Sequence, residues 1–254
     1  MSQDSTERFT HRVDAYQRYR PGYPEPLFEA LVEIGGLGKG ARVADLGAGT
    51  GLFCEQLLNR GLEVFAVEPN EAMRTAAETR LGNQPGFHAV AASAETTSLE
   101  AASVELVSAA QALHWFHGEA ALDEMHRILV PEGQVALVWN RRDTRQPFQQ
   151  AYDGMLRELL PEYNQVNHMN LTAADLEMYF VPGQMQLLQF ANPQRLDFTS
   201  LLGRLRSTSY CPPENTPDYI ALVNELLALF DRHAHEGQVV FDYDTHLYLG
   251  PVSR

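Results

Sequence analysis

The stretch Val43–Gly51 constrains the fold of this chain more than any other. An apolar run ends there at an acidic residue, Asp45, and glycines then alternate at Gly47, Gly49 and Gly51. Because glycine has no side chain, a ligand can lie against bare backbone, and the chain can adopt angles that other residues avoid. An apolar helical pattern follows at once. A strand, a glycine loop and a helix in this order predict a ligand site at the carboxyl end of a strand.

Apolar strands and amphipathic helices alternate around this loop. Strands are expected at residues 42–46, 63–68, 87–90, 104–109 and 134–139, with a turn at 131–133. Helices are expected at 24–32, 52–59, 70–80 and 119–129, the first with Leu27, Leu31 and Ile34 along one face. Continuous apolar strands separated by helices are typical of a parallel sheet that is covered on both faces.

The remainder of the chain departs from this rhythm. Helical patterns recur near 146–160, 173–180, 199–206 and 217–235, and residues 186–198 look extended with a break at Asn192-Pro193. Residues 238–249 alternate apolar and polar side chains, which predicts a long antiparallel strand at the end of the sheet. We therefore expect an α/β fold: a Rossmann-like, seven-stranded, mostly parallel sheet with a terminal antiparallel strand and a small helical cap insertion.

One domain is expected over residues 1–254. Within it, residues 1–34 would form an N-terminal lid and helix, and residues 40–140 the ligand-binding core. Residues 141–184 would form the helical cap insertion. Residues 185–254 would supply the C-terminal strands and helices that complete the sheet and the substrate side.

Composition excludes several classes of function. The chain has 254 residues, 44% of them hydrophobic, and its 19 basic and 33 acidic residues give a net charge of -14. This charge disfavours nucleic acid and anionic membrane partners, because binding to either needs a basic surplus. The two cysteines, Cys54 and Cys211, have no metal-ligand spacing. We expect no metal site and a reduced, cytoplasmic setting for a monomer or homodimer, without a signal or membrane segment.

Three acids restrict the ligand. Asp45 precedes the glycines, Glu68 ends the second strand, and Glu95 follows the third. The glycine spacing also differs from the GxGxxG fingerprint of dinucleotide-binding loops. Carboxylates at this edge would repel a pyrophosphate, and an acid after the second strand can accept hydrogen bonds from ribose hydroxyls. The pattern favours a cationic nucleoside such as S-adenosylmethionine.

At this point the chain resembles a known family. It is similar to the class I S-adenosylmethionine-dependent methyltransferases, in particular the methyltransferase type 11 branch, which includes trans-aconitate methyltransferase-like proteins. The matching motifs fall in order within roughly residues 12–140. They are Tyr16–Pro24, Val43–Gly51, Val67–Asn70, Ser93–Glu95 and Gln111–Phe116.

The resemblance implies a set of residues around S-adenosylmethionine and its product S-adenosylhomocysteine. Gly47, Gly49 and Gly51, with Ala48 between them, would lie against the methionine moiety, and Asp45 would lie near its amino group, directly or through water. The ribose hydroxyls would be held by Glu68. The adenine would be flanked by Pro69, Met73 and Ala94, with Glu95 at its amine. The sulfonium side would be lined by Gln111, Ala112 and Trp115. Tyr19 and Arg20 would close over the cofactor, with Arg20 near its carboxylate.

The function expected from this resemblance is methyl transfer to a small-molecule acceptor by in-line displacement. A protein that binds the cofactor without catalysis is an open alternative, because this chemistry has no obligatory nucleophile. An NAD-dependent oxidoreductase is a third reading, disfavoured by the glycine spacing and Asp45. His114 is a candidate general base, as is His117, with a purely structural role as the alternative.

The acceptor is not determined by these motifs. Arginine forks suit carboxylates, so a carboxylic acid is one candidate. The arginines that could bind it are Arg141, Arg142, Arg145, Arg204 and Arg206. Ordinary surface positions are expected for most of them, and Tyr210 is a further pocket candidate.

Overall fold

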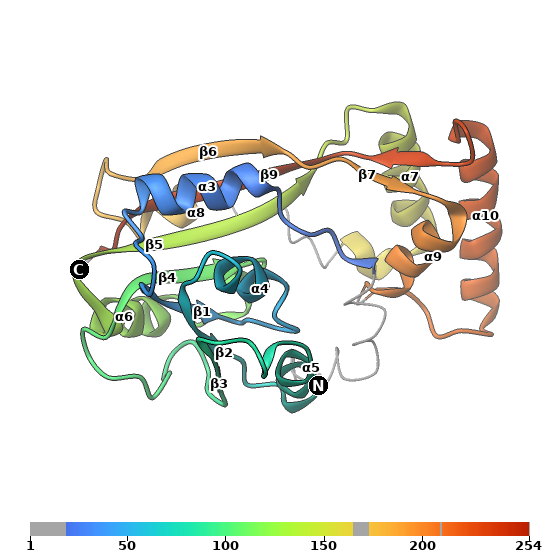
Figure 1. Cartoon of the computed structure of the whole chain (residues 1–254). Coiled ribbons are helices and arrows are strands. Elements are labelled where there is room, and N and C mark those ends of the chain that lie inside the picture. The colour runs from blue at the N-terminus through green and yellow to red at the C-terminus, as the bar shows by residue number, and fades with distance from the viewer. Residues whose placement is uncertain (1–18, 165–172, 209, 254) are drawn as a thin grey trace.

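A seven-stranded sheet lies at the centre of the protein, with the order β3-β2-β1-β4-β5-β9-β6 (Figure 1). The computed structural model describes residues 19–164, 173–208 and 210–253. The strands of the sheet are β1 Arg42–Leu46, β2 Glu63–Val67, β3 Phe87–Val90, β4 Val104–Ala110, β5 Leu129–Arg142, β6 Gln186–Ala191 and β9 Tyr243–Pro251. The five strands β1 to β5 are parallel to one another, and β9 is antiparallel to both of its neighbours, β5 and β6. The Rossmann-like, mostly parallel sheet is confirmed.

The prediction for the last strand needs correction. Residues 238–249 form two strands, β8 Val239–Phe241 and β9, which separate at Asp242. Strand β9 lies between β5 and β6, not at the edge of the sheet, while β8 pairs with β7 Gln194–Leu196 in a separate two-stranded sheet. The alternating pattern continues through both strands, so it shows neither the break nor the neighbours, which long-range pairing decides.

The turn expected at 131–133 lies inside a strand. Strand β5 begins at Leu129, and its pairing with β4 shifts from Val104–Leu129 to Leu106–Gln134. The extra residues form a bulge in the ladder, in which Glu132 has a φ of 68°. A bulge uses the same turn-forming residues as a loop while the strand continues on both sides.

The α-helices lie close to the predicted positions, and the two short 3-10 helices, η1 and η2, were not predicted. Their bounds are α3 Glu25–Ile34, α4 Leu52–Leu58, α5 Glu71–Leu81, η1 Leu113–Trp115, α6 Gly118–Ile128, α7 Pro147–Leu159, η2 Pro161–Asn164, α8 Ala173–Glu177, α9 Phe198–Arg206 and α10 Pro217–His233. One face was wrong: Leu27, Phe28 and Leu31 are the buried residues of α3, whereas Ile34 is 38% exposed. Ile34 is the last residue of that helix, beyond the turns that contact the sheet.

Two hydrophobic clusters cover opposite faces of the sheet. Val43 belongs to the cluster that contains Leu27 of α3 and Phe53 of α4. Its neighbour Ala44 belongs to the cluster that contains Met125 of α6. Adjacent residues divide between the clusters because side chains alternate across a strand. The sheet is thus buried on both faces, and its carboxyl edge carries the loops.

A third cluster forms beyond the end of the main sheet, and we call it the helical lobe (Figure 1). Its core includes Tyr152 of α7, Leu205 of α9, Leu226 of α10 and Phe241 of β8. The expected 141–184 insertion therefore lies in two places: α7 is in the lobe, whereas Leu176 of α8 packs in the main core. The predicted division of the single domain stays a prediction.

Candidate functional site

The glycine loop joins β1 to α4 at the carboxyl edge of the sheet. Gly47, Gly49 and Gly51 have φ values of 69°, 58° and 78°, in the left-handed region that favours glycine. The amides of Gly47 and Ala48 both donate to the carbonyl oxygen of Val67, at 2.9 and 3.1 Å. The loop is thus fixed to the end of β2. Strand order reverses between β1 and β4, which is where open α/β sheets bind ligands.

The three glycines meet different surroundings. A Cβ on Gly47 would lie 2.6 Å from the Cβ of Ala112, and one on Gly51 would lie 2.6 Å from Cδ1 of Leu81. Both glycines are required by protein packing. A Cβ on Gly49 would have no atom within 4 Å. The middle of the loop therefore offers open space beside its backbone.

Glu68 follows β2 and is bound to this loop. Its Oε2 accepts a hydrogen bond from the Gly49 amide at 2.8 Å, and its Oε1 accepts one from the Asn70 amide at 2.9 Å. Burial raises the pKa of Glu68 against the opposing effect of these two amides. Each carboxylate oxygen can accept a further bond. A hydroxyl-bearing ligand at the loop could use that capacity.

Asp45 lies in the interior near the carboxyl end of β1. Its carboxyl is 1% exposed and accepts hydrogen bonds from Ser108 Oγ at 2.7 Å and Cys54 Sγ at 3.1 Å. Burial raises its pKa to about 6. Asp45 thus connects β1 to β4 and α4 in the interior. Neither partner was predicted from the sequence, in which the serine within the apolar strand β4 was the available signal.

The segment after β3 carries Ala94 and Glu95. Ala94 is buried in the main core, and Glu95 Oε1 accepts a hydrogen bond from the His117 amide at 2.9 Å. Burial would raise the pKa of Glu95, but hydrogen bonds from His117 and Ser93 outweigh it and hold the pKa below its ordinary value. Glu95 is therefore an anion that is hydrogen-bonded to His117, the residue before α6.

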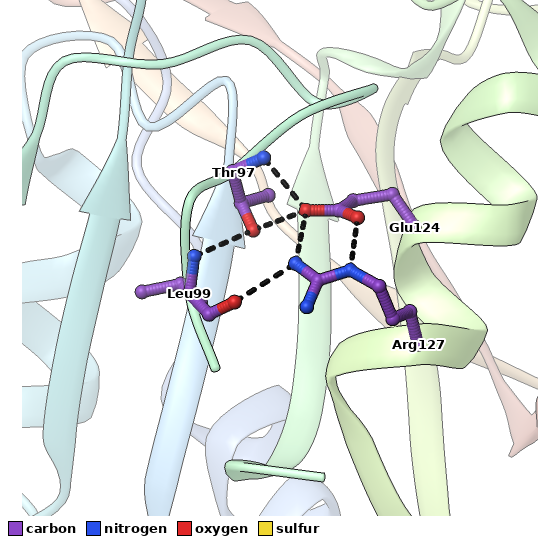
Figure 2. Close-up of polar contacts among 4 residues, drawn as sticks. All are labelled: Thr97, Leu99, Glu124 and Arg127. Atoms are coloured by element: carbon purple, nitrogen blue, oxygen red, sulfur yellow. Dashed lines mark hydrogen bonds and ion pairs between the residues drawn. The ribbon is translucent and has the colours of Figure 1, made fainter. Parts of the chain in front are cut away.

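A buried acid anchors the same segment to α6, as Figure 2 shows. Glu124 Oε1 accepts hydrogen bonds from the Thr97 amide at 2.7 Å and the Thr97 hydroxyl at 2.6 Å. Arg127 pairs with Glu124 at 2.7 Å and donates to the Leu99 carbonyl oxygen at 2.8 Å. The hydrogen bonds from Arg127 and then Thr97 lower the pKa of Glu124 to about 2, against burial. No pattern in the sequence predicted this anchor.

The segment after β4 lies beside the glycine loop. Gln111 has a φ of 58°, and its side chain donates to the Asn140 carbonyl oxygen at 3.3 Å. Ala112 is buried against Gly47. His114 and Trp115 are half-buried with ring centroids 4.6 Å apart. The structure thus brings Ala112 to the loop, while the ring of His114 packs on Trp115.

The start of α5 places the other predicted contacts after β2. Pro69 is exposed, whereas Met73 is 4% exposed. Asn70 caps the helix, because its Oδ1 accepts a hydrogen bond from the Met73 amide at 3.0 Å. This cap was predicted. Asn70 also donates a hydrogen bond from its backbone amide to Glu68, so the start of α5 is connected to that acid.

Tyr19 and Arg20 contact the helical lobe. Arg20 donates to the carbonyl oxygen of Ser207 at 3.1 Å, and the ring of Tyr19 packs against Gly203, where a Cβ would lie 2.4 Å from it. Both contacts are with α9 or the residue after it. The part of the predicted N-terminal motif before residue 19 lies outside the described residues.

Two of the five candidate arginines, Arg142 and Arg204, are largely shielded from solvent. The side chain of Arg142 is 12% exposed, and Arg204 is 8% exposed as a residue. In contrast, the side chains of Arg145 and Arg206 are 83% and 39% exposed. The periodicity of α9 does not reveal the burial of Arg204, because its surroundings come from distant strands and helices.

Two features are absent from the described residues. No three or more histidine, cysteine or acidic side chains gather there as a metal site. Within the same residues, no helix combines the length and apolar character that crossing a membrane requires.

Known proteins resemble this chain in sequence. Residues 44–137 match the methyltransferase domain family named Methyltransf_11. A methyltransferase of Mycobacterium tuberculosis, named as uncharacterized, is 32% identical over 245 residues, covering 95% of this chain and 94% of the relative. Another from Schizosaccharomyces pombe, also named as uncharacterized, is 27% identical and covers 94% of this chain and 95% of the relative.

Solved structures share the fold. A candidate type II methyltransferase from Anaeromyxobacter dehalogenans has a TM-score of 0.68 and 23% identity, covering 92% of this chain and 98% of that one. Phosphoethanolamine N-methyltransferase 2 of Haemonchus contortus, in complex with S-adenosylmethionine, has a TM-score of 0.58 and 15% identity, covering 98% of this chain and 61% of that one. The resemblance to the trans-aconitate subtype stays a prediction. The sheet order, the glycine loop and the near full-length relatives together show that this chain belongs to the class I S-adenosylmethionine-dependent methyltransferases.

Proposed function

We propose that S-adenosylmethionine binds along the glycine loop and that the protein transfers its methyl group to a small-molecule acceptor. The single observation that carries the proposal is the pairing of an open backbone at Gly49 with the carboxylate of Glu68 on the Gly49 amide. A ligand that lies on this backbone meets, in the same place, an acid able to accept bonds from ribose hydroxyls.

A buried hydroxyl in the glycine loop also supports a bound cofactor. The hydroxyl of Thr50 is buried and has no hydrogen-bond partner among the described residues. A buried hydroxyl of this kind needs a partner to offset its loss of water. Thr50 was not among the residues expected from the sequence. We include it with Gly47, Gly49 and Glu68 as a residue that would hold the cofactor.

The other predicted residues take roles that follow from their positions. Met73 and Ala94 would flank the base, and Glu95 is a fixed anion for an amine. Asp45 would lie near the amino group of the methionine moiety, directly or through water, and its hydrogen bonds with Ser108 and Cys54 fix its carboxylate in place. Gln111, Ala112 and Trp115 would face the reacting side.

Bound S-adenosylmethionine supplies an electrophilic methyl group on a sulfonium. The protein needs to align an oxygen, nitrogen or carbon nucleophile with that group and to exclude water. In this displacement the acceptor forms a bond to the methyl carbon, the carbon–sulfur bond breaks, and S-adenosylhomocysteine remains. His114 is retained as a candidate for receiving the acceptor's proton.

Calorimetric titration with S-adenosylhomocysteine and with NAD tests the cofactor. We expect saturable binding of S-adenosylhomocysteine and none of NAD; the reverse result would overturn the proposal. Transfer of a radiolabelled methyl group across a panel of acids, amines and phenols then tests catalysis. Binding without transfer to any acceptor would favour the alternative of a non-catalytic cofactor-binding protein.

A further inference from the structure

Five side chains of the helical lobe and the adjoining strands form what we call the arginine–tyrosine cluster. They come from the ends of β5 and α9, from α7, from η2 and from the start of β9. The members are Arg142, Tyr152, Tyr163, Arg204 and Tyr243. Arg142 and Tyr243 are opposite one another in the β5–β9 ladder, so their side chains project from the same face.

Arg204 is a buried cation with an unused donor. Its Nε and Nη2 donate to the hydroxyl of Tyr243 at 3.0 and 2.6 Å. Its guanidinium also lies 5.7 Å from the ring centroid of Phe241. Nη1 is buried without a hydrogen-bond partner, and no carboxylate in the described part of the chain is within ion-pairing distance of Arg204.

Arg142 shares its carboxylate partner, Asp153, with Arg157 and Tyr163. It donates a hydrogen bond to the Tyr163 hydroxyl and lies 3.5 Å from Asp153. The same carboxylate accepts bonds from Arg157 at 2.6 Å and from Tyr163 at 2.5 Å. One acid thus serves two arginines, while Arg204 pairs with none among the described residues. The cluster carries a surplus of buried positive charge in a chain whose net charge is -14.

Tyr152 lies between the surroundings of the two arginines. It is 1% exposed, its ring centroid lies 5.9 Å from the Arg142 guanidinium, and the same ring lies 5.2 Å from that of Phe241, which Arg204 also contacts. Burial raises the pKa of Tyr152 well above its ordinary value, so its hydroxyl stays protonated and can donate. Neutral tyrosines do not compensate the charge of Arg204, and a buried charge without a counterion is costly.

The cluster lies on the side of the sheet where the glycine loop is found. Strand β5 pairs with β4 as far as Val138 and continues for four residues to Arg142. At ~3.3 Å per residue, Arg142 lies about 13 Å past the end of that pairing. Strand β5 runs parallel to β1, so this extension points in the direction in which β1 enters the glycine loop. An extended acceptor could have one end at the glycine loop and the other at the arginine–tyrosine cluster.

We propose that the arginine–tyrosine cluster binds an oxyanion, a carboxylate or a phosphate, on the acceptor, at a distance from the nucleophile that receives the methyl group. The fork of an arginine side chain suits both anions, which would supply the missing partner of Arg204. As a statement about the acceptor, this inference rests on the proposed function.

The test uses the full chain saturated with S-adenosylhomocysteine. The probes are aromatic and aliphatic compounds with a distal hydroxyl, each prepared as a carboxylate, a phosphate monoester and a neutral carboxamide. Their binding is measured by thermal shift and calorimetry at matched ionic strength. We expect an anionic form to bind while its carboxamide does not, and the comparison of carboxylate with phosphate identifies which oxyanion is preferred.

Arg204→Gln should weaken binding of that anion about tenfold to hundredfold, which is the range for hydrogen bonds to charged groups. Affinity for S-adenosylhomocysteine should change less than about twofold. Arg195→Gln, at an exposed arginine of β7 in the same lobe, is the matched control and should change neither affinity. Should Arg204→Gln fail to fold by circular dichroism, Arg204→Lys keeps the charge, loses the fork and should still weaken binding.

Equal binding of anion and carboxamide would overturn the inference, as would an unchanged anion affinity in the folded Arg204 variants. Failure of every anionic probe to bind the loaded protein would also overturn it. These outcomes leave the cofactor proposal intact. Wild-type protein that does not bind S-adenosylhomocysteine would instead refute the proposed function.

Discussion

The glycine-loop edge, formed by residues 47–51 with Glu68, and the arginine–tyrosine cluster are built in opposite ways. At the loop edge, a carboxylate is held by backbone amides, and the residues joined by the Gly49–Glu68 bond are 19 positions apart. In the cluster, the contacts are between side chains, and the members come from positions between 142 and 243. One region gathers negative charge and the other positive charge.

This difference separates binding of the methyl donor from selection of the acceptor. A backbone loop needs only the right dihedral angles and small residues, so a short motif is enough to specify it. A site of side chains depends on where several distant segments pack. The first region therefore indicates the methyl donor from spacing alone, while the second offers selectivity that a motif cannot show. We therefore expect that the two regions can be altered independently.

The largest effect is expected for Gly49→Ala. The added methyl group would occupy the open space beside the loop, so affinity for S-adenosylhomocysteine should fall by at least about a hundredfold, or about 3 kcal/mol. Gly183→Ala is the matched control, because Gly183 also has a positive φ, 75°, and open surroundings. Both variants should lose similar stability from backbone strain. Calorimetry that gave equal affinities for the two would contradict the placement of the cofactor.

Glu124→Gln tests how firmly α6 anchors the segment of Ala94 and Glu95. The free energy of unfolding at pH 7 should fall by about 2–3 kcal/mol, because a buried, paired carboxylate is lost. The pKa of Glu124 is lowered from 4.5 to about 2, so its stabilisation is present above pH 4.5 and is lost as pH falls toward 2. The difference between variant and wild type should therefore shrink over that window.

Urea titrations at pH 7 and pH 3 measure this change. Glu119→Gln, at an exposed acid of the same helix, serves as the control and should shift stability by less than about 0.5 kcal/mol. A difference between Glu124→Gln and wild type that does not depend on pH would show that the ionised carboxylate is not what holds the segment.

Glu68→Gln should reduce affinity for S-adenosylhomocysteine about tenfold, about 1.4 kcal/mol, because a neutral amide accepts hydroxyl bonds less strongly. It should leave binding of the anionic probes to the cluster unchanged, which makes the independence of the two regions measurable. Glu71→Gln, an exposed neighbour in α5, is the control. A loss of anion binding in Glu68→Gln would mean that the two regions are coupled.

The smallest effect is expected for Arg157→Gln. Its side chain is 56% exposed and pairs with Asp153 four residues earlier on α7. Exposed pairs of this kind contribute little, so stability should change by less than about 0.5 kcal/mol, and anion affinity should not fall. A clear drop in anion affinity, measured by calorimetry, would place the oxyanion at Arg157 and not at the buried arginines.

The main elements of the fold were predictable because each is specified locally. The strand Arg42–Leu46 and its helix follow from apolar periodicity, and the cap at Asn70 follows from its residue type. The orientation of Asp45 was not predictable. An acid at a strand end is visible in the sequence, but its hydrogen bonds to Ser108 and Cys54 depend on which strand and helix lie beside it.

The sequence by itself determined the order of strands and helices, the glycine loop and the acid Glu68 that follows the second strand, because periodicity and backbone freedom act over a few residues. Only the tertiary structure decided the place of β9 inside the sheet, the interior position of Asp45 and the burial of Arg204 beside Tyr243. These features arise from pairing and packing between distant segments. The burial of Arg204 carries the inference about the acceptor, whereas the donor could be inferred from local pattern.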